Sequence, residues 1–388
     1  MIQQLGPFHF FQTYSANDLH WITPVKLVAA QEGIVLSDEE VLAMPYLEKV
    51  KWLNKNPTAV TLYIYDVFRR FIYDFMIKTE VFGKVKDFVV KVEFQQRGTP
   101  HIHLILWIQD APVHGVNSDE ELIAFIDKYI FCEIPQENDP LCEVVKKCQT
   151  HKCLKNKCKR KNGIDCKYNF PKLPTESTVI SSGHDTEEYK NLPSASKKVI
   201  ANNMSKVLEK LREGSAIHDS VKEFLSTLNL SKSDYSMVLK FGFNKPTVIH
   251  KRKPSEAYIN CYNPYTLRLL ESNQDVAFVL SMYGCICYLL SYICKPERNM
   301  SKLMKEITLK ENGEACSLLA MMKKEWMNKR EMGIPEAIFN LLSLPLLWKS
   351  REVVYLPADY PEERIRVLKL QNSGKFQINN NFSSVTLK

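Results

Sequence analysis

Residues 85–108 read VKDFVVKVEFQQRGTPHIHLILWI, and the expected fold follows from this stretch. Two runs alternate apolar and polar side chains, and QRGTP between them carries the glycine and proline of a tight connection. The stretch therefore predicts an antiparallel β-hairpin. Because strand side chains alternate, His101 and His103 share one face of the second strand, whereas the opposite face is wholly apolar and belongs to a core.

The register of this hairpin determines which side chains lie beside the two histidines. Matching the apolar faces of the two strands places Gln95 opposite His101 and Glu93 opposite His103, across a five-residue loop. Two imidazoles beside a carboxylate and an amide can bind a divalent cation and leave positions open for substrate oxygens. The alternative interpretation is a pair of surface histidines whose hydrogen bonds are satisfied.

A second motif, YLLSYICK at residues 288–295, indicates a helix that carries two tyrosines. Tyr288 and Tyr292 are four residues apart and share a helix face, and Lys295 lies on nearly the same face. A phenol with a pKa of about 10 is a poor nucleophile at neutral pH. A nearby lysine and a metal-polarised phosphate favour attack by the phenolate, which gives a phosphotyrosine ester. The alternative is that these tyrosines pack in a core.

A third motif, CQTHKCLKNKCKRKNGIDC at residues 148–166, combines thiols, an imidazole and many lysines. His151, Cys153, Cys158 and Cys166 suit a closed tetrahedral zinc site, and Cys148 is a substitute for any of them. The alternative is that these cysteines are free. Ten of the 52 basic residues and one acidic residue fall in 146–172, so this segment alone is sufficient to account for the net charge of +8. This charge predicts a polyanion partner and a DNA-facing patch at Lys157, Lys159, Arg160 and Lys161.

The composition of the whole chain excludes several classes of protein. With 388 residues, 45% hydrophobic and 25% charged, it is an ordinary globular chain of two or three domains. Eleven cysteines, an odd number, and no signal peptide at the start predict reduced thiols, not a disulfide framework. Residues 276–294 carry no charge, but their serines, tyrosines and glycine favour a buried helix, so we expect no membrane span.

The remaining segments are assigned from their periodicity and composition. Helical patterns cover residues 58–79, 120–130, 194–228 and 263–295, a linker rich in Ser, Thr and Glu covers 173–190, and a basic strand or loop covers 246–254.

The combination of a histidine–hydrophobic–histidine strand with a later Tyr-x-x-x-Tyr helix resembles the HUH endonucleases of rolling-circle replication and transposition. The similarity is closer to the Rep domain of Helitron transposases, the Helitron helicase-like N-terminal module. It is carried by LGPFHFFQTYSANDLHW (5–21), EFQQRGTPHIHLILWI (93–108), CKYNFPKLP (166–174) and the stretch from YNPYTLRLL to ICKPERNMS (262–301). The similarity extends from about residue 4 to residue 305, and a weaker similarity continues to about residue 365.

The resemblance implies a role for each group of candidate residues. His101 and His103 are ligands of Mg²⁺ or Mn²⁺, with Glu93 preferred over Gln95 as the third ligand. Tyr288 and Tyr292 are the nucleophiles, assisted by Lys295. The chain departs from the family at Ser291, where many members have lysine, and at Cys153, where the family often has the second histidine of a His-x-His pair.

The resemblance also implies a substrate and a context. The implied activity is nicking and joining of single-stranded DNA at transposon ends and targets, in the nucleus. Full-length relatives continue into a helicase, but no G-x-x-x-x-G-K-[ST] motif occurs in this chain, so we expect no ATPase here. The alternative function is a non-enzymatic, domesticated DNA-binding protein that uses the zinc loop and the basic surface.

We therefore expect an α+β fold: an HUH-type central antiparallel sheet flanked by helices, with an inserted zinc-binding loop and helical segment. The expected divisions are 1–140, the first part of the nuclease domain; 141–175, the basic zinc loop; 176–250, a linker and helical insertion; 251–365, the second part with the tyrosine helix; and 366–388, a flexible tail.

Overall fold

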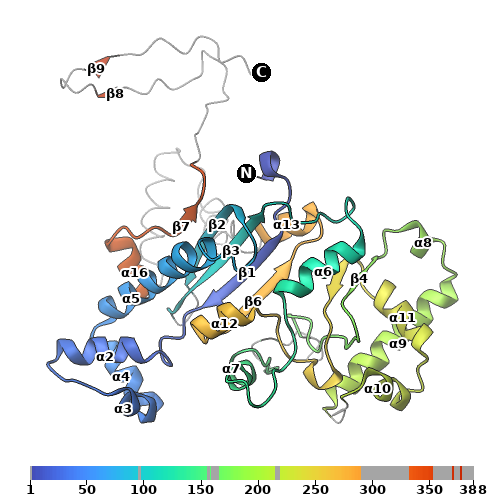
Figure 1. Ribbon diagram of the computed structural model, residues 1–388, viewed down its shortest axis with the longest axis horizontal. Helices are drawn as coiled ribbons and strands as arrows, with labels where there is room; N and C mark the ends of the chain where they lie inside the picture. Colours follow the sequence, from blue (N-terminus) through green and yellow to red (C-terminus); the bar gives the residue numbers. More distant parts are fainter. Residues whose placement is uncertain are drawn as a thin grey trace, which may run out of the picture. The chain divides into compact units, whose positions relative to one another are not determined.

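The hairpin expected from the sequence lies in the middle of an antiparallel sheet (Figure 1). Among the described residues the sheet has five strands, in the order β6-β1-β3-β2-β7, and every neighbouring pair is antiparallel. The strands are β1 (Phe10–Ser15), β2 (Val85–Phe94), β3 (Pro100–Ile108), β6 (Gln274–Phe278) and β7 (Leu347–Lys349). The expected α+β architecture, with the histidine strand β3 central, is confirmed.

The computed structural model describes residues 2–94, 98–154, 158, 166–214, 219–289, 332–352, 369–370 and 376–377. The chain divides into two compact units, residues 1–350 and 351–388. In the second unit, β8 (Lys369–Leu370) and β9 (Phe376–Gln377) pair antiparallel.

One face of the sheet lies on the main hydrophobic core. Helices α2 (Ile22–Gln31), α5 (Pro57–Arg70), α6 (Asp119–Tyr129) and α16 (Ile334–Leu341) cover this face. Helix α5 is capped by Asn56, whose side chain accepts a hydrogen bond from the backbone N–H of Ala59, and it continues as the π-helix η1 (Phe71–Ile77). The helices expected at 58–79 and 120–130 are thus confirmed.

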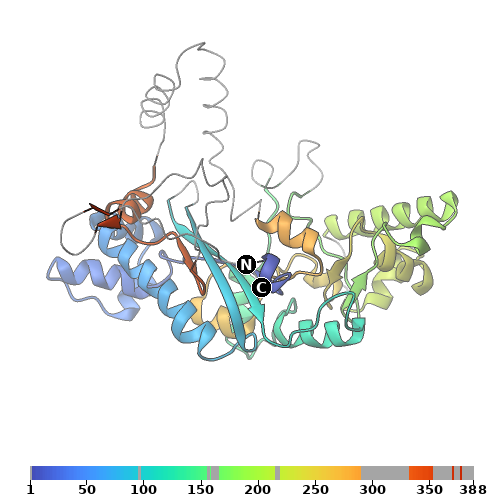
Figure 2. The same ribbon diagram turned by 90° about the horizontal axis from the view of Figure 1, so that it is seen from above.

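The opposite face of the sheet is also partly covered, which the sequence did not predict. Every residue of β3 is buried. Ile105 and Trp107, on the histidine face, pack against the N-terminal segment at Phe8 and against α13 (Met282–Tyr288) at Cys285. Figure 2 shows α5 and α13 on opposite sides of the sheet. A β-strand buried on both faces holds its side chains rigidly, and this rigidity suits a site.

The second hydrophobic core is formed mainly by the helical segment at residues 194–241 and also includes Leu173, Ile249 and Ala257. The helices expected at 194–228 are present as α9 (Ser194–Arg212) and α10 (Val221–Thr227), and both pack with α11 (Lys232–Phe241). The other helices are α1 (Ile2–Leu5), α3 (Asp38–Ala43), α4 (Tyr46–Lys55), α7 (Leu141–Cys148), α8 (Glu187–Lys190), α12 (Pro264–Leu270) and the 3₁₀ turn η2 (Pro254–Glu256).

The continuous helix expected at residues 263–295 is wrong for its described part. Helix α12 ends at Leu270, Glu271 adopts a left-handed conformation, and residues 274–278 form the edge strand β6. Within β6, Gln274, Val276 and Phe278 are buried. This period-two pattern was obscured by the apolar residues that follow, and pairing with β1 decides the strand conformation.

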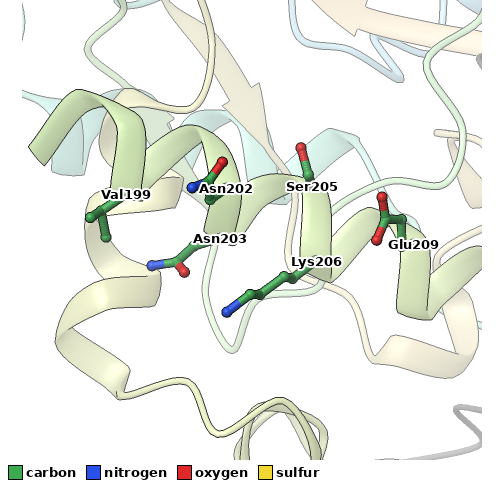
Figure 3. Close-up of a pocket in the computed structure, with 6 residues that line it drawn as sticks. All are labelled: Val199, Asn202, Asn203, Ser205, Lys206 and Glu209. Atoms are coloured by element: carbon green, nitrogen blue, oxygen red, sulfur yellow. The ribbon is translucent and has the colours of Figure 1, made fainter. Parts of the chain in front are cut away.

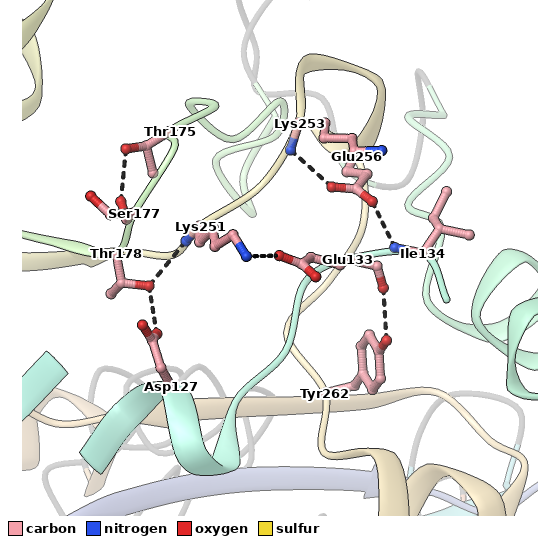
Figure 4. A network of polar contacts seen from close by, with 10 residues as sticks. All are labelled: Asp127, Glu133, Ile134, Thr175, Ser177, Thr178, Lys251, Lys253, Glu256 and Tyr262. Carbon is pink, nitrogen blue, oxygen red and sulfur yellow. Dashed lines mark hydrogen bonds and ion pairs between the residues drawn. The ribbon is translucent and has the colours of Figure 1, made fainter. Parts of the chain in front are cut away.

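The linker expected at residues 173–190 is also wrong. Residues Val179–Ser181 form β4, which pairs with β5 (Thr247–Ile249). Figure 4 shows why this polar segment is fixed: the Thr178 hydroxyl donates to Asp127 of α6 at 2.5 Å and accepts from the backbone N–H of Lys251 at 3.1 Å. Serine and threonine hydroxyls that suggested a loop are here buried and hydrogen-bonded.

Candidate metal and nucleophile site

The register of the β2–β3 hairpin differs from the expected one by two residues. Glu93 lies opposite His101 and Lys91 opposite His103, where we expected Gln95 and Glu93. A shift of two keeps every side chain on its face, so alternation fixes the faces of a strand but not its register. Pro100 pairs with Phe94 and belongs to the strand, not to the loop.

Glu93, His101 and His103 form one cluster on the face opposite the main core. One ligand atom from each residue lies within 4.8 Å of the others. The Glu93 Oε2 atom is 2.9 Å from His103 Nε2 and 3.4 Å from His101 Nε2, so two imidazole nitrogens converge on one carboxylate oxygen. The side chains of His101 and His103 are 8% and 2% exposed, whereas that of Glu93 is 29% exposed. The donor set fits a divalent cation.

Thr13 of β1 contacts the far side of the His103 ring, a contact that the sequence did not predict. Its Oγ1 atom lies 2.9 Å from His103 Nδ1. When Nδ1 carries the proton, it donates to Thr13, and the lone pair of Nε2 faces Glu93 and is available to a cation. Strand alternation in FFQTYS gives the face of Thr13, but its partner 90 residues away is set by the pairing of β1 with β3.

Tyr288, at the end of α13, lies on the same face of the sheet as the histidine pair. Its ring stacks on Phe11, with centroids 4.4 Å apart and planes at 18°. Phe11 in turn stacks on His103, with centroids 5.6 Å apart and planes at 25°. The rings of Tyr288 and His103 are therefore separated by no more than the sum of these two distances. The sequence did not predict Phe11 as the link.

A cavity of about 210 Å³ lies beside the cluster and is lined by residues 15–20 and 99–101, His101 among them. It gives a polar approach to the cluster past Ser15, Asp18 and Thr99. Burial raises the pKa of the Asp18 carboxyl above its ordinary value. A larger hollow of about 440 Å³ runs along α9 (Figure 3), but the side chains that line it include no histidine or cysteine.

The cysteine cluster forms a second group of metal-ligating side chains. His151, Cys153, Cys158 and Cys166 place one ligand atom each within 4.8 Å of one another and could hold a metal ion such as zinc. The His151 ring stacks on Phe170 at 4.3 Å, and its Nε2 lies 3.3 Å from the Cys166 sulfur. Cys148 lies apart: its thiol donates to the carbonyl of Glu271 at 3.3 Å.

The electrostatics of this cluster suit a dication. Burial, together with the neighbouring Cys166 and Cys158, raises the pKa of Cys153 to about 12. Burial also opposes ionisation of Cys166, but hydrogen bonds from the backbone N–H groups of Phe170 and Tyr168 hold its pKa below the ordinary value. Crowded thiolates repel one another, and a bound cation removes this repulsion.

Several predicted site residues lie outside the described residues. These are Gln95, Tyr292, Lys295 and the basic residues Lys157, Lys159, Arg160 and Lys161.

Comparison with known proteins supports one relationship. Residues 1–106 match the family model described as the Helitron helicase-like domain at N-terminus. The resemblance seen in the sequence is thus confirmed for this part of the chain. It includes His101 and His103, whereas Tyr288 and the cysteine cluster lie beyond it. A comparison with curated proteins gives no match.

The sequence predicts no membrane span. Over the part of the chain that the structure describes, every helix is too short or too polar to cross a bilayer.

Proposed function

We propose that this chain is an HUH-type endonuclease related to Helitron transposases, which nicks and joins single-stranded DNA through a 5′-phosphotyrosine intermediate. The observation that carries the proposal is the placement of Glu93, His101 and His103 on the same face of the sheet as Tyr288, joined by the Phe11 ring. The DNA-related match over residues 1–106 supports the same substrate class. This assignment implies action on chromosomal DNA and a nuclear location.

Glu93, His101 and His103 would hold Mg²⁺ or Mn²⁺, which when bound supplies Lewis-acid polarisation of the scissile phosphate. Thr13 Oγ1 would accept a hydrogen bond from His103 Nδ1, which leaves Nε2 of the same ring to coordinate the cation. Phe11 holds the Tyr288 ring over the same face. The Tyr288 oxygen, having lost its proton to solvent, attacks phosphorus in line, the P–O3′ bond breaks, and the 3′ oxygen takes up a proton. Tyr292 would take the second strand in the rejoining step, and Lys295 would favour the phenolates.

The cysteine cluster would hold a structural Zn²⁺ in this proposal. A small loop rich in lysine has no core of its own, so a metal is what fixes it. Its site is closed, because His151, Cys153, Cys158 and Cys166 already supply four ligands. The lysines between these ligands would contact the DNA backbone.

A nicking assay that also measures binding tests the proposal. A 5′-labelled single strand derived from an element end is incubated with the protein and Mn²⁺. We expect a shortened labelled strand with wild type and none with His101→Ala or His103→Ala. Fluorescence anisotropy should show DNA binding of both variants within about twofold of wild type, because the proposal assigns the backbone contacts that give affinity to the lysines of the zinc loop. His114→Ala, which changes a histidine outside the cluster, is the matched control and should cleave normally.

The competing function, a DNA-binding protein without catalysis, predicts a different pattern. It predicts binding that depends on the zinc loop, and no cleavage with any end-derived strand or either metal. It also predicts that His101→Ala leaves every measured property unchanged.

A further inference from the structure

Cys132 and Cys261 lie side by side, outside both metal clusters. Their sulfur atoms are 3.2 Å apart although the two residues are separated by 129 positions in the chain. Next to them, Phe131 and Tyr262 exchange two backbone hydrogen bonds of 2.8 and 2.9 Å. Cys132 and Cys261 therefore occupy the following, non-hydrogen-bonded position of an antiparallel pair, where opposing side chains approach most closely.

The surroundings give the two thiols different roles. Cys132 is 1% exposed, and burial, reinforced by its hydrogen bond to Cys261, raises its pKa well above the ordinary value. Cys261 is partly exposed. The hydrogen bond from Cys132 holds the pKa of Cys261 well below the ordinary value against the effect of burial, and His250 and Arg252 act in the same direction.

Backbone carbonyls close to Cys261 hold the Arg252 guanidinium in place. The Arg252 guanidinium donates to the carbonyls of Ile259 and Glu256 at 2.8 and 3.3 Å, and the side chain is only 3% exposed. An arginine locked in this way keeps its charge near the Cys261 sulfur. A thiolate beside fixed positive charge, with a second thiol in contact, is the arrangement of a reactive dithiol.

We propose that Cys132 and Cys261 are a covalent modification site, which closes to an intramolecular disulfide by exchange with a low-molecular-weight disulfide such as glutathione disulfide. Cys261 is the nucleophile, because it is the less buried residue of the pair and lies close to the Arg252 charge. Cys132 is the resolving thiol.

The exchange proceeds in two balanced steps. The Cys261 thiolate attacks one sulfur of the external disulfide, a mixed disulfide forms, and the first thiolate leaves. Cys132 then loses its proton to that thiolate, its sulfur attacks Cys261 Sγ, and the second thiolate leaves and takes a proton from water. The two cysteines are oxidised to cystine, and the external disulfide is reduced to two thiols.

The new bond would join segments that already support the zinc cluster. The backbone N–H of His151 donates to the Tyr258 carbonyl at 2.8 Å, so the segment that carries Cys261 also contacts a residue of the cysteine cluster. Figure 4 shows the partner segment, in which the Glu133 carbonyl accepts from the Tyr262 hydroxyl at 2.7 Å. Closing a long loop restricts the unfolded chain, so the oxidised protein should melt at a higher temperature than the reduced protein.

Peptide mapping of the full chain, loaded with zinc and treated with glutathione disulfide, tests the site. We expect a single new linked peptide that contains Cys132 and Cys261, and its loss on reduction. Cys132→Ala should accumulate glutathione on Cys261, because the resolving thiol is gone, whereas Cys261→Ala should leave Cys132 unmodified. Cys142→Ala, which removes a buried cysteine of α7 that is 1% exposed, is the matched control and should form the same linked peptide.

A measurement on wild-type protein keeps the test independent of the variants. Brief alkylation at pH 7 should label Cys261 at least about tenfold faster than Cys142, because only a thiolate reacts. The proposal would be overturned if oxidation left both cysteines free or linked either one to another cysteine. Equal alkylation rates at Cys261 and Cys142 would also overturn it. Neither the linked peptide nor the alkylation rates depend on nicking activity, so this test is separate from the test of the proposed function.

Discussion

Thr13 contacts the side of the His103 ring that faces away from Glu93. Its hydroxyl lies 2.9 Å from His103 Nδ1, while the Nε2 of the same ring faces Glu93. A hydrogen-bond partner on the far side of a metal-ligating histidine orients the ring and raises the basicity of the nitrogen that binds the metal. We therefore expect the Thr13 contact to hold the His103 ring in place for a cation that Thr13 itself does not touch.

Replacing Thr13 tests this dependence. We expect Thr13→Val, which keeps the shape and removes the hydroxyl, to weaken Mn²⁺ binding about 10- to 100-fold, whereas Thr13→Ser keeps near-normal affinity. Isothermal titration calorimetry with Mn²⁺ measures both. Equal affinity in the valine and wild-type proteins would show that the contact is structural only.

His9 makes folding stability depend on pH. Its Nδ1 accepts from the backbone N–H of Ile108 at 3.0 Å, and burial, assisted by the charge of Lys86, lowers its pKa from 6.5 to about 4. Below pH 6.5 the unfolded chain binds a proton that the folded chain does not bind. Stability therefore falls as the pH drops from 6.5 toward 4, and this histidine is neutral in both states above that window.

The expected size of this effect is about 2 kcal/mol at pH 5 relative to pH 8, from the linkage of the two pKa values. His9→Asn keeps an acceptor at the same place and has no proton to gain. Urea denaturation of both proteins at pH 8 and pH 5 should therefore show a loss in wild type that exceeds the loss in the variant by this amount. Parallel losses would exclude His9 as the cause.

At the scale of elements, the sequence predicts which face of a strand each side chain occupies better than it predicts which residues of two strands lie opposite each other. The alternation in residues 85–108 predicts both strands and the shared face of His101 and His103. It did not predict that Glu93 lies opposite His101, because a shift of two leaves the pattern unchanged. Register depends on the strand pairing as a whole, which includes β1 and β7 from distant parts of the chain.

The same limit explains the two wrong segment assignments. The stretch QDVAF at residues 274–278 is compatible with a helix and with a strand, and only pairing with β1 decides between them. The polar residues at 173–190 suggested a linker, because a sequence does not show that the buried Thr178 hydroxyl has a partner in Asp127, 51 residues away. The sequence predicts the helical part that ends at Tyr288, but it does not predict the stacking of Tyr288 on Phe11.

The cysteine cluster is an element whose stability should depend on metal. We expect purified wild-type protein to retain about one equivalent of zinc through dialysis, because four ligands close the site. Cys158→Ala should retain far less, since Cys158 is a ligand that is only 3% exposed. Cys148→Ala, which changes a cysteine outside the cluster, should retain the wild-type amount. Elemental analysis by mass spectrometry measures all three.

At the scale of the whole molecule, the candidate site combines parts that lie far apart in the sequence. The Helitron match ends at residue 106, within the histidine strand, whereas Tyr288 comes from α13. Strand β6 pairs with β1 and leads directly into that helix, so the sheet brings both parts to one face. The fivefold division of the chain expected from the sequence remains a prediction.

The chemical identity of the protein–DNA linkage tests the central claim most directly. Protein is incubated with single-stranded end DNA and Mn²⁺, the DNA is digested, and the adduct is mapped by tandem mass spectrometry. We predict a nucleotide 5′-phosphate on Tyr288 or Tyr292, absent without metal, absent in His103→Ala and absent in the Tyr288→Phe, Tyr292→Phe double variant. An adduct that persists in the double variant, or one that forms equally in His103→Ala, would contradict a shared phosphate between the histidine pair and the tyrosine helix.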